Sequence, residues 1–436
     1  MAQGTRLDDP LTLPCGAVIP NRLAKAAMTE GLATGQGVPT SALERLYGLW
    51  SDGGAGLLIS GNIQVDRDHL ERPGNVVLDQ VPAAEMREAL VRWAQAATRS
   101  GNHFWAQISH AGRQVMKNVN PHPKAPSAVK LGLPGGQFGE PVALTVAEIR
   151  DIVRRFGVAA AACQAAGFTG VQVHAAHGYL LSSFLSPRTN LRDDDYGGSL
   201  ENRARALLET VAAVRSAVGP AFPVAVKLNS ADFQKGGFAF EDSLQVARWL
   251  EEASVDLIEI SGGTYEQPRL LDVEGLEPVE QQDVAATTLA REAYFVDFAR
   301  AMQEQVRIPL MVTGGFRRRD AMEQALSSGA ADLVGLGRPL CVVTDAPAQL
   351  LAGLQELPRF EDQLSFFPPW LRFLNRVTLL RALAGFGTLY WFYSQLVELG
   401  EHGRPSPKLS VPAATWRVLS AQKRLLAQRS TATDTH

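Results

Sequence analysis

The segment QVHAAHGYL, residues 172–180, brings His174, His177 and Tyr179 close together in the chain. Two imidazole N–H groups that converge on one oxygen can hold a carbonyl group and withdraw electron density from a conjugated C=C bond. Each such donor can lower a reaction barrier by ~3 kcal/mol. A phenol with the ordinary pKa of about 10 is protonated at neutral pH and can act as a general acid. These residue types could therefore bind and protonate an unsaturated carbonyl compound.

Two other roles compete for the same histidines. A metal site is one, but zinc needs a third protein ligand, and the sequence has no HExxH motif or cysteine cluster that supplies it. Packing in the core is the other, and for a single histidine at a strand end it would be an equally good explanation. The combination of His174, His177 and Tyr179 at this spacing favours the donor role, and we predict no metal.

Two glycine motifs near the end of the predicted barrel could hold a phosphate. They are TGG at residues 313–315 and GLGRP at residues 335–339. Glycines let backbone N–H groups approach an anion, and Arg338 could add a charge-assisted contact. The alternative is that these glycines only form tight turns. Their position after two consecutive predicted strands favours the phosphate site.

The elements that position these residues alternate between short apolar runs and Ala- and Leu-rich helical stretches. The runs are nearly continuous rather than alternating, as expected of parallel strands that are covered by helices. They predict an α/β fold, a (β/α)8 TIM barrel, with the chemistry at the C-terminal ends of its strands. A doubly wound sheet is the competitor, but no glycine-rich dinucleotide turn follows the first strand. The predicted strands are residues 21–28, 56–65, 103–110, 170–176, 222–229, 257–263, 308–315 and 332–339.

Two of the intervening helices have clear ends. One begins at Thr145, which stands in capping-box spacing with Glu148, and ends at Gly167. The other begins at Ser199 and ends at Gly219. We therefore expect regular helices between these pairs of residues.

Several stretches together resemble the Old Yellow Enzyme family, the FMN-dependent ene-reductases on a (β/α)8 barrel. They are NRLAKAAMT, QISHAGR, HAAHGYLLSSFLSPRTNLRDDDYGGSLENRAR, TGG and GLGRP. The resemblance covers residues 8 to about 355, and its long central stretch is highly specific. It implies that the domain over residues 1–355 binds FMN and uses NAD(P)H as co-substrate.

The resemblance also assigns residues to the cofactor. Ala27, Met28 and Thr29 would lie along the isoalloxazine, Gly61 and Gln107 would meet the ring edge, and Gly262, Gly314, Gly315, Gly337 and Arg338 would hold the phosphate. Lys227 falls where the family commonly has an arginine near flavin N1. A cation there stabilises the negative charge of reduced flavin. We regard the alternative, a barrel-core lysine with a salt-bridge partner, as the weaker one because buried lysines are rare.

The implied reaction is ping-pong reduction of an α,β-unsaturated carbonyl compound. NAD(P)H passes a hydride to flavin N5, the substrate oxygen then binds His174 and His177, and Tyr179 protonates the α-carbon. A flavin-dependent dehydrogenase or demethylase on the same scaffold is one alternative. A non-redox phosphate-binding barrel enzyme, such as an aldolase or isomerase, is another, and a non-catalytic binding protein is the last.

A loop from Gly112 to Leu144 leaves the third predicted strand and is rich in proline and glycine. Loops of this length are often active-site lids. His110, Arg113 and Gln114 could reach the substrate or could only anchor the loop. The sequence favours neither role.

The segment 356–436 lies beyond the resemblance and is expected to form a C-terminal hydrophobic helical extension. Its aromatic-rich part, residues 366–393, must pack on something. The candidates, in order, are a helix on the barrel, a dimer contact and an interfacial membrane anchor, and the aromatics could also reach the substrate pocket. With the resemblance, this tail leads us to expect a homodimer and no membrane association.

Composition excludes several classes. The net charge of −3 over 436 residues, with both signs interspersed, gives no reason to expect a nucleic-acid partner. The scattered Cys15, Cys163 and Cys341 predict neither a disulfide framework nor a zinc or iron–sulfur site. Because the first residues contain no apolar signal core, we expect a cytoplasmic protein.

Overall fold

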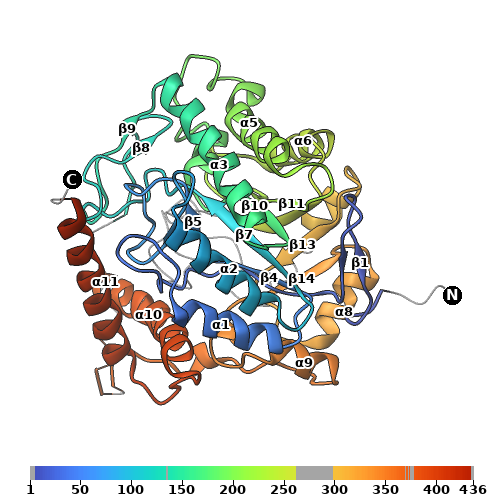
Figure 1. Cartoon of the computed structure of the whole chain (residues 1–436), viewed down its shortest axis with the longest axis vertical. Coiled ribbons are helices and arrows are strands. Elements are labelled where there is room, and N and C mark those ends of the chain that lie inside the picture. Colours follow the sequence, from blue (N-terminus) through green and yellow to red (C-terminus); the bar gives the residue numbers. More distant parts are fainter. Residues whose placement is uncertain are drawn as a thin grey trace.

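The computed structural model describes residues 5–133, 136–261, 298–368, 370–371, 373 and 378–433 (Figure 1). Its centre is a closed barrel of parallel strands, in which β14 pairs with β3 and β7 pairs with β10. Each apolar run predicted from the sequence contains one barrel strand, so the predicted (β/α)8 barrel is confirmed. The strands are β3 (Leu23–Lys25), β4 (Leu57–Ile59), β7 (His103–Ser109), β10 (Gly170–Ala175), β11 (Val224–Asn229), β12 (Leu257–Ser261), β13 (Leu310–Thr313) and β14 (Leu333–Leu336).

Helices follow the strands and cover the barrel. The two predicted helix starts are confirmed: Thr145 forms a capping box with Glu148, and the Ser199 side chain accepts a hydrogen bond from the third residue after it. Gly219 ends the second helix with φ 78°, a left-handed conformation that glycine adopts without strain. The helices are α1 (Ser41–Asp52), α2 (Ala84–Thr98), α3 (Val146–Ala165), α4 (Leu180–Leu185), α5 (Leu200–Val218), α6 (Phe240–Glu252), α8 (Arg319–Ser327) and α9 (Ala346–Leu351), with 3-10 helices η3 (Arg338–Cys341) and η4 (Phe360–Gln363).

The N-terminal end of the barrel is closed by an apolar hairpin. Strands β1 (Leu11–Thr12) and β2 (Val18–Ile19) pair antiparallel. Leu11, Leu13 and Ile19 pack with inward-facing residues from the beginnings of the barrel strands, among them Leu257 and Leu333. The polar groups of the barrel therefore gather at its other end. Short strands there extend the structure: β5 (Ile63–Gln64) and β6 (Val76–Val77) beside β7, and β8 (Lys124–Ala125) paired with β9 (Val142–Ala143) in the long loop.

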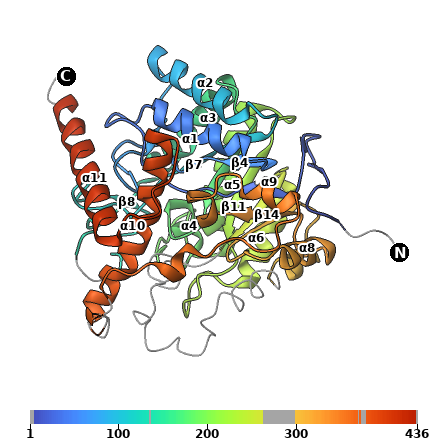
Figure 2. The same cartoon turned by 90° about the horizontal axis from the view of Figure 1, so that it is seen from below.

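Two long helices, α10 (Thr378–His402) and α11 (Val411–Thr433), form the C-terminal part of the chain. Figures 1 and 2 show them side by side, with α10 between α11 and the barrel. Helix α10 packs on α1 and η3, and it buries Trp391, Phe392 and Leu396. Among the described residues, no helix is long and apolar enough to cross a membrane. Trp370 and Trp416 remain largely exposed, and the homodimer stays a prediction.

Candidate active site

The structure brings His174, His177 and Tyr179 into contact at the C-terminal end of β10. Nε2 of His174 lies 3.2 Å from Nδ1 of His177, and the rings of His174 and Tyr179 have centroids 4.7 Å apart. His174 and Tyr179 are each only 3% exposed. His174 and Tyr179 are therefore shielded from water, which strengthens hydrogen bonds to developing charge, whereas His177 is half-buried.

An unusual backbone turn aims the second histidine. His177 has φ 62°, a conformation that costs a non-glycine residue energy and occurs often at functional sites. Its N–H donates to Asn229 Oδ1 at 3.0 Å, and its carbonyl accepts from Gln114 Nε2 at 2.8 Å. Side chains from β11 and from the long loop thus hold this turn on both sides.

Burial keeps both imidazoles neutral. It lowers the pKa of His174 well below the ordinary value, and the charges of His177 and Lys227 lower it further. The pKa of His177 falls for the same reasons, burial first and then Lys227. A neutral imidazole carries one N–H, so the neighbours of each ring decide which nitrogen can donate to a substrate.

Two neighbours of His174 favour different tautomers. Asn62 Nδ2 donates to Glu71 Oε2 at 2.7 Å, so its Oδ1, 3.0 Å from His174 Nδ1, is an acceptor that favours a proton on Nδ1. Ser109 Oγ lies 3.3 Å from the same Nδ1 and can donate to it instead. Only the arrangement with Ser109 as donor leaves the proton on Nε2, where it can be given to a substrate oxygen. Sequence reasoning missed Asn62 and Glu71.

A buried polar chain crosses the barrel beneath the histidines. Gln107 Nε2 donates to Gln172 Oε1 at 2.7 Å, and Gln172 Nε2 donates to Glu259 Oε2 at 2.8 Å. Lys227 Nζ lies 2.9 Å from Glu259 Oε1. We expected a barrel-core lysine with a salt-bridge partner to be the weaker alternative for Lys227. That expectation is wrong, because Glu259 stands opposite Lys227 in the register of β11 and β12 and pairs with it. Polar residues two positions apart at the ends of apolar strands, such as Gln172 and His174, were the signal for this chain.

The ends of β3 and β4 lie against each other. A Cβ on Gly61 would stand 2.5 Å from the Met28 carbonyl oxygen, so glycine is needed for this close approach. Thr29 Oγ1 donates to Glu71 Oε2 at 2.6 Å, and Ala27 packs against the apolar interior of the barrel. Met28, Thr29 and Gly61 are thus close enough to face one flat ligand.

The glycine motifs after β13 and β14 have the properties of a phosphate site. Gly314 and Gly315 have φ 138° and 74°, and Gly337 immediately precedes Arg338 at the start of η3. Arg317, which sequence reasoning missed although it follows TGG directly, places Nη2 2.7 Å from Glu361 Oε1. Arg338 Nη1 lies 3.9 Å from the same oxygen, so two guanidinium groups lie beside one carboxylate at this turn. Gly262 lies outside the described residues.

The end of β3 and the turn after β14 are also close to each other. Met28 Sδ lies 3.6 Å from Cys341 Sγ, and a Cβ on Gly337 would stand 3.9 Å from Met28 Sδ. This end of the barrel therefore offers the Lys227 ammonium, the Gln107 amide, the close approach at Gly61 and the glycine turn before Arg338. This donor set fits the ring and the phosphate of FMN.

The loop residues left open by the sequence act as anchors. Arg113 Nη1 donates to the carbonyls of Val129 and Lys130, at 3.4 and 3.1 Å. Ala111 and Val115 pack on Tyr179, and Gln114 binds the His177 carbonyl as described above. The beginning of the loop therefore supports the candidate catalytic residues directly.

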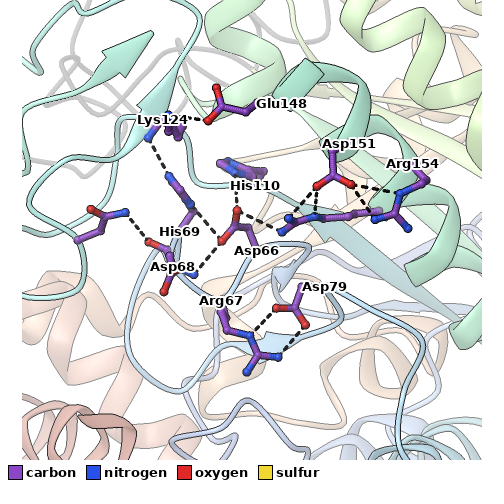
Figure 3. A network of polar contacts seen from close by, with 12 residues as sticks. Asp66, Arg67, Asp68, His69, Asp79, His110, Lys124, Glu148, Asp151 and Arg154 are labelled. Carbon is purple, nitrogen blue, oxygen red and sulfur yellow. Dashed lines mark hydrogen bonds and ion pairs between the residues drawn. The ribbon is translucent and has the colours of Figure 1, made fainter. Parts of the chain in front are cut away.

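His110 belongs to a separate cluster with His69 and Asp66 (Figure 3). His69 Nδ1 lies 3.2 Å and His110 Nε2 lies 3.8 Å from an Asp66 oxygen. The opposite nitrogen of each ring accepts a backbone N–H, from Lys124 at 2.7 Å and from Gly112 at 3.0 Å. The nitrogens that face Asp66 therefore carry the protons and cannot ligate a metal. This cluster ties the long loop to the segment after β5.

Comparisons with known proteins agree with this geometry. Residues 7–356 match the model of the NADH:flavin oxidoreductase / NADH oxidase family. The NADH-dependent flavin oxidoreductase iliE of Hypocrea jecorina is 38% identical over an alignment of 358 residues that covers 76% of this chain and 86% of that protein. Among solved structures, the old yellow enzyme homologue from Zymomonas mobilis is 26% identical with a TM-score of 0.66 over 83% of this chain and 97% of that one. Morphinone reductase is 26% identical with a TM-score of 0.65, over 82% and 92%.

Proposed function

Because the chain belongs to the NADH:flavin oxidoreductase / NADH oxidase family, we propose that it reduces the activated C=C bond of α,β-unsaturated carbonyl compounds. Membership makes it an FMN-dependent NAD(P)H oxidoreductase of the Old Yellow Enzyme type, and it excludes the non-redox barrel enzyme. The proposal adds the substrate class and the residue roles. The contacts of His174 with His177 and with the Tyr179 ring, where His174 and Tyr179 are buried, are the observation that carries it.

FMN, when bound, supplies the hydride that NAD(P)H delivers. In the proposal, the ring is held by Ala27, Met28, Thr29, Gly61, Gln107 and Lys227, and the phosphate by Gly314, Gly315, Gly337 and Arg338, with Gly262 as a further prediction. Lys227 would place positive charge beside the ring. Glu259 offsets part of that charge, so we expect a weaker pull on electrons than an unpaired cation would give.

The histidines and the tyrosine act on the substrate. The substrate's carbonyl oxygen accepts one hydrogen bond from His174 and one from His177. These two bonds replace the direct contact between the two rings. Donation by His174 Nε2 requires the tautomer in which Ser109 donates to Nδ1. Tyr179, packed against the His174 ring, gives its proton to the α-carbon of the substrate.

The visible spectrum of the holoenzyme, recorded without oxygen, tests this proposal. NADH or NADPH should bleach the flavin bands, and cyclohexenone added afterwards should restore them. Tyr179→Phe should leave the bleaching unchanged and slow the return by about a hundredfold or more, since a general acid contributes at least that much. Flavin that NADH reduces and no enone reoxidises would point instead to a dehydrogenase or demethylase that works in the opposite direction.

A further inference from the structure

Arg72 is a buried cation beside the candidate site. Its side chain is 7% exposed, and among the described residues no carboxylate oxygen lies within 4.0 Å of its nitrogens. Its Nε has no hydrogen-bond partner, and Nη1 makes the one hydrogen bond of the guanidinium in the described part of the chain, to the Thr29 carbonyl at 3.4 Å. A buried charge without a counterion costs several kcal/mol. An arginine kept in such a place therefore needs a physical explanation.

Tyr393 of α10 covers the flat face of this guanidinium. The Arg72 Cζ lies 3.9 Å from the centroid of the Tyr393 ring, which is a cation–π contact. Burial raises the pKa of the Tyr393 phenol although Arg72 lowers it, so the ring is neutral. A ring over the flat face leaves the N–H groups in the guanidinium plane available. Tyr393 stands outside the residues that match the family model, 7–356.

The guanidinium lies next to the residues that surround His174. It contacts the Thr29 carbonyl, and the Thr29 hydroxyl donates to Glu71, which also accepts from Asn62. Asn62 in turn contacts His174. Gly31 makes room for the arginine: a Cβ there would stand 2.9 Å from Nη2, and φ is 69°.

We propose that Arg72, held in place by Tyr393, binds a carboxylate of the substrate, so that the preferred substrates are α,β-unsaturated carbonyl compounds with a carboxylate group. The planar N–H fork of arginine matches the two oxygens of a carboxylate. Glu71, the acidic neighbour of Arg72 in the sequence, is already engaged by Thr29 and Asn62. This inference rests on the proposed function. A phosphate of NAD(P)H has related chemistry, and the experiment separates the two sources.

The test compares cyclohexenones that carry a carboxylate, or its methyl ester, on a saturated ring carbon, so that the reactivity of the enone is matched. The unsubstituted protein should prefer the acid. Arg72→Met should lower kcat/KM for the acid by roughly 10- to 100-fold, the range for a hydrogen bond to a charged group, and change the ester little. The Kd of each compound, measured from its effect on the oxidised flavin spectrum, should follow the same pattern without turnover.

Variants of α10 separate positioning from folding. Tyr393→Phe keeps the ring over Arg72 and should keep the preference for the acid, whereas Tyr393→Leu should lose part of it. Phe392→Leu is the matched control, because Phe392 is buried on the same helix and should lower Tm without changing the ratio of acid to ester.

Three results would overturn the inference. They are equal Kd values for acid and ester, an equal loss for both compounds in Arg72→Met, and a loss confined to flavin reduction by NADH, which would assign the cation to a dinucleotide phosphate. If Arg72→Met does not fold, an unchanged ratio in Tyr393→Leu has the same meaning. If no enone reoxidises the flavin, the proposed function fails, and the two Kd values still test the anion site.

Discussion

Two histidine pairs lie at the same end of this barrel, and their surroundings differ in one respect. In the pair His69 and His110, the far nitrogen of each ring accepts a backbone N–H, which fixes the near nitrogen as a donor to Asp66. In the pair His174 and His177, the nitrogens face side chains and each other. The first pair has one possible proton arrangement, whereas the second can choose between two.

The difference separates a structural pair from a pair suited to catalysis. A backbone N–H is always a donor and has a fixed position, so it fixes the tautomer of the imidazole that accepts its hydrogen bond. A hydroxyl side chain such as that of Ser109 can act as donor or as acceptor within the same geometry, whereas Glu71 holds the Asn62 amide with its oxygen towards His174. All four residues are histidines, and all but the half-buried His177 are buried, so the partner of each nitrogen is what best distinguishes the pairs.

Removal of one imidazole from each pair should give the largest contrast. His174→Ala or His177→Ala should lower kcat/KM for an enone by about 10²- to 10³-fold, the effect of one lost donor to an oxyanion. His110→Gln should lower it by less than about tenfold, since that ring contacts Asp66, the His69 ring and loop backbone rather than the candidate catalytic residues. Steady-state rates with cyclohexenone measure both. Equal losses in His110→Gln and His174→Ala would erase the distinction.

The pH dependence of stability should reveal the locked pair. Burial, helped by the charge of His69, lowers the pKa of His110 to about 4, below the value near 6.5 in an unfolded chain. As pH falls from about 6.5 to about 4, His110 becomes protonated in the unfolded chain but stays neutral in the folded chain. The free energy of unfolding therefore decreases over this range, and the decrease is complete below about pH 4. His110→Gln should remove roughly 2 kcal/mol of the drop between about pH 7.5 and pH 5.

Urea denaturation of the holoenzyme at these pH values provides the measurement. Burial raises the pKa of Asp66, but its hydrogen bonds to His110 and His69 lower it further, so this carboxylate contributes only below the window. His174 and His177 add a slope of the same sign, which the variant retains. His122→Gln is the control because that ring is exposed. A slope that His110→Gln leaves unchanged would contradict the prediction.

The choice of proton arrangement at His174 should give the smallest effect. Ser109→Ala removes the donor to Nδ1 and leaves Asn62, so the imidazole should favour the form with no proton on Nε2. Loss of one neutral hydrogen bond is worth about 1 kcal/mol, so flavin reoxidation by an enone should slow by roughly fivefold while reduction by NADH stays the same. Stopped-flow traces of the two half-reactions separate these outcomes. Ser109→Thr keeps the hydroxyl and should restore the rate.

The barrel could be predicted because its strands are apolar runs and its helices carry local end signals. His174, His177 and Tyr179 could be found because they are neighbours in the chain. Their supporting partners could not, since Asn62 comes from the end of another strand and Glu259 becomes the partner of Lys227 only through the register of β11 and β12.

Neither the role of His110 nor the contact of Arg72 with Tyr393 could be predicted from the sequence. His110 is followed by a loop whose path decides whether the ring meets a substrate or Asp66, and composition does not encode that path. Arg72 and Tyr393 are far apart in the sequence, and they meet because α10 packs beside the barrel in the folded chain. The aromatic tail did indicate that some contact of this kind was needed.

The first turn of the long loop has a consequence for anyone who wants to change what this protein accepts. Gln114 donates a hydrogen bond to the His177 carbonyl, and Ala111 and Val115 pack against the Tyr179 ring. Randomised libraries at these positions would disturb the reacting groups together with the pocket, and most members would be slow rather than newly selective. Diversity placed at the exposed Pro121 and His122 would leave the residues that contact Tyr179 unchanged.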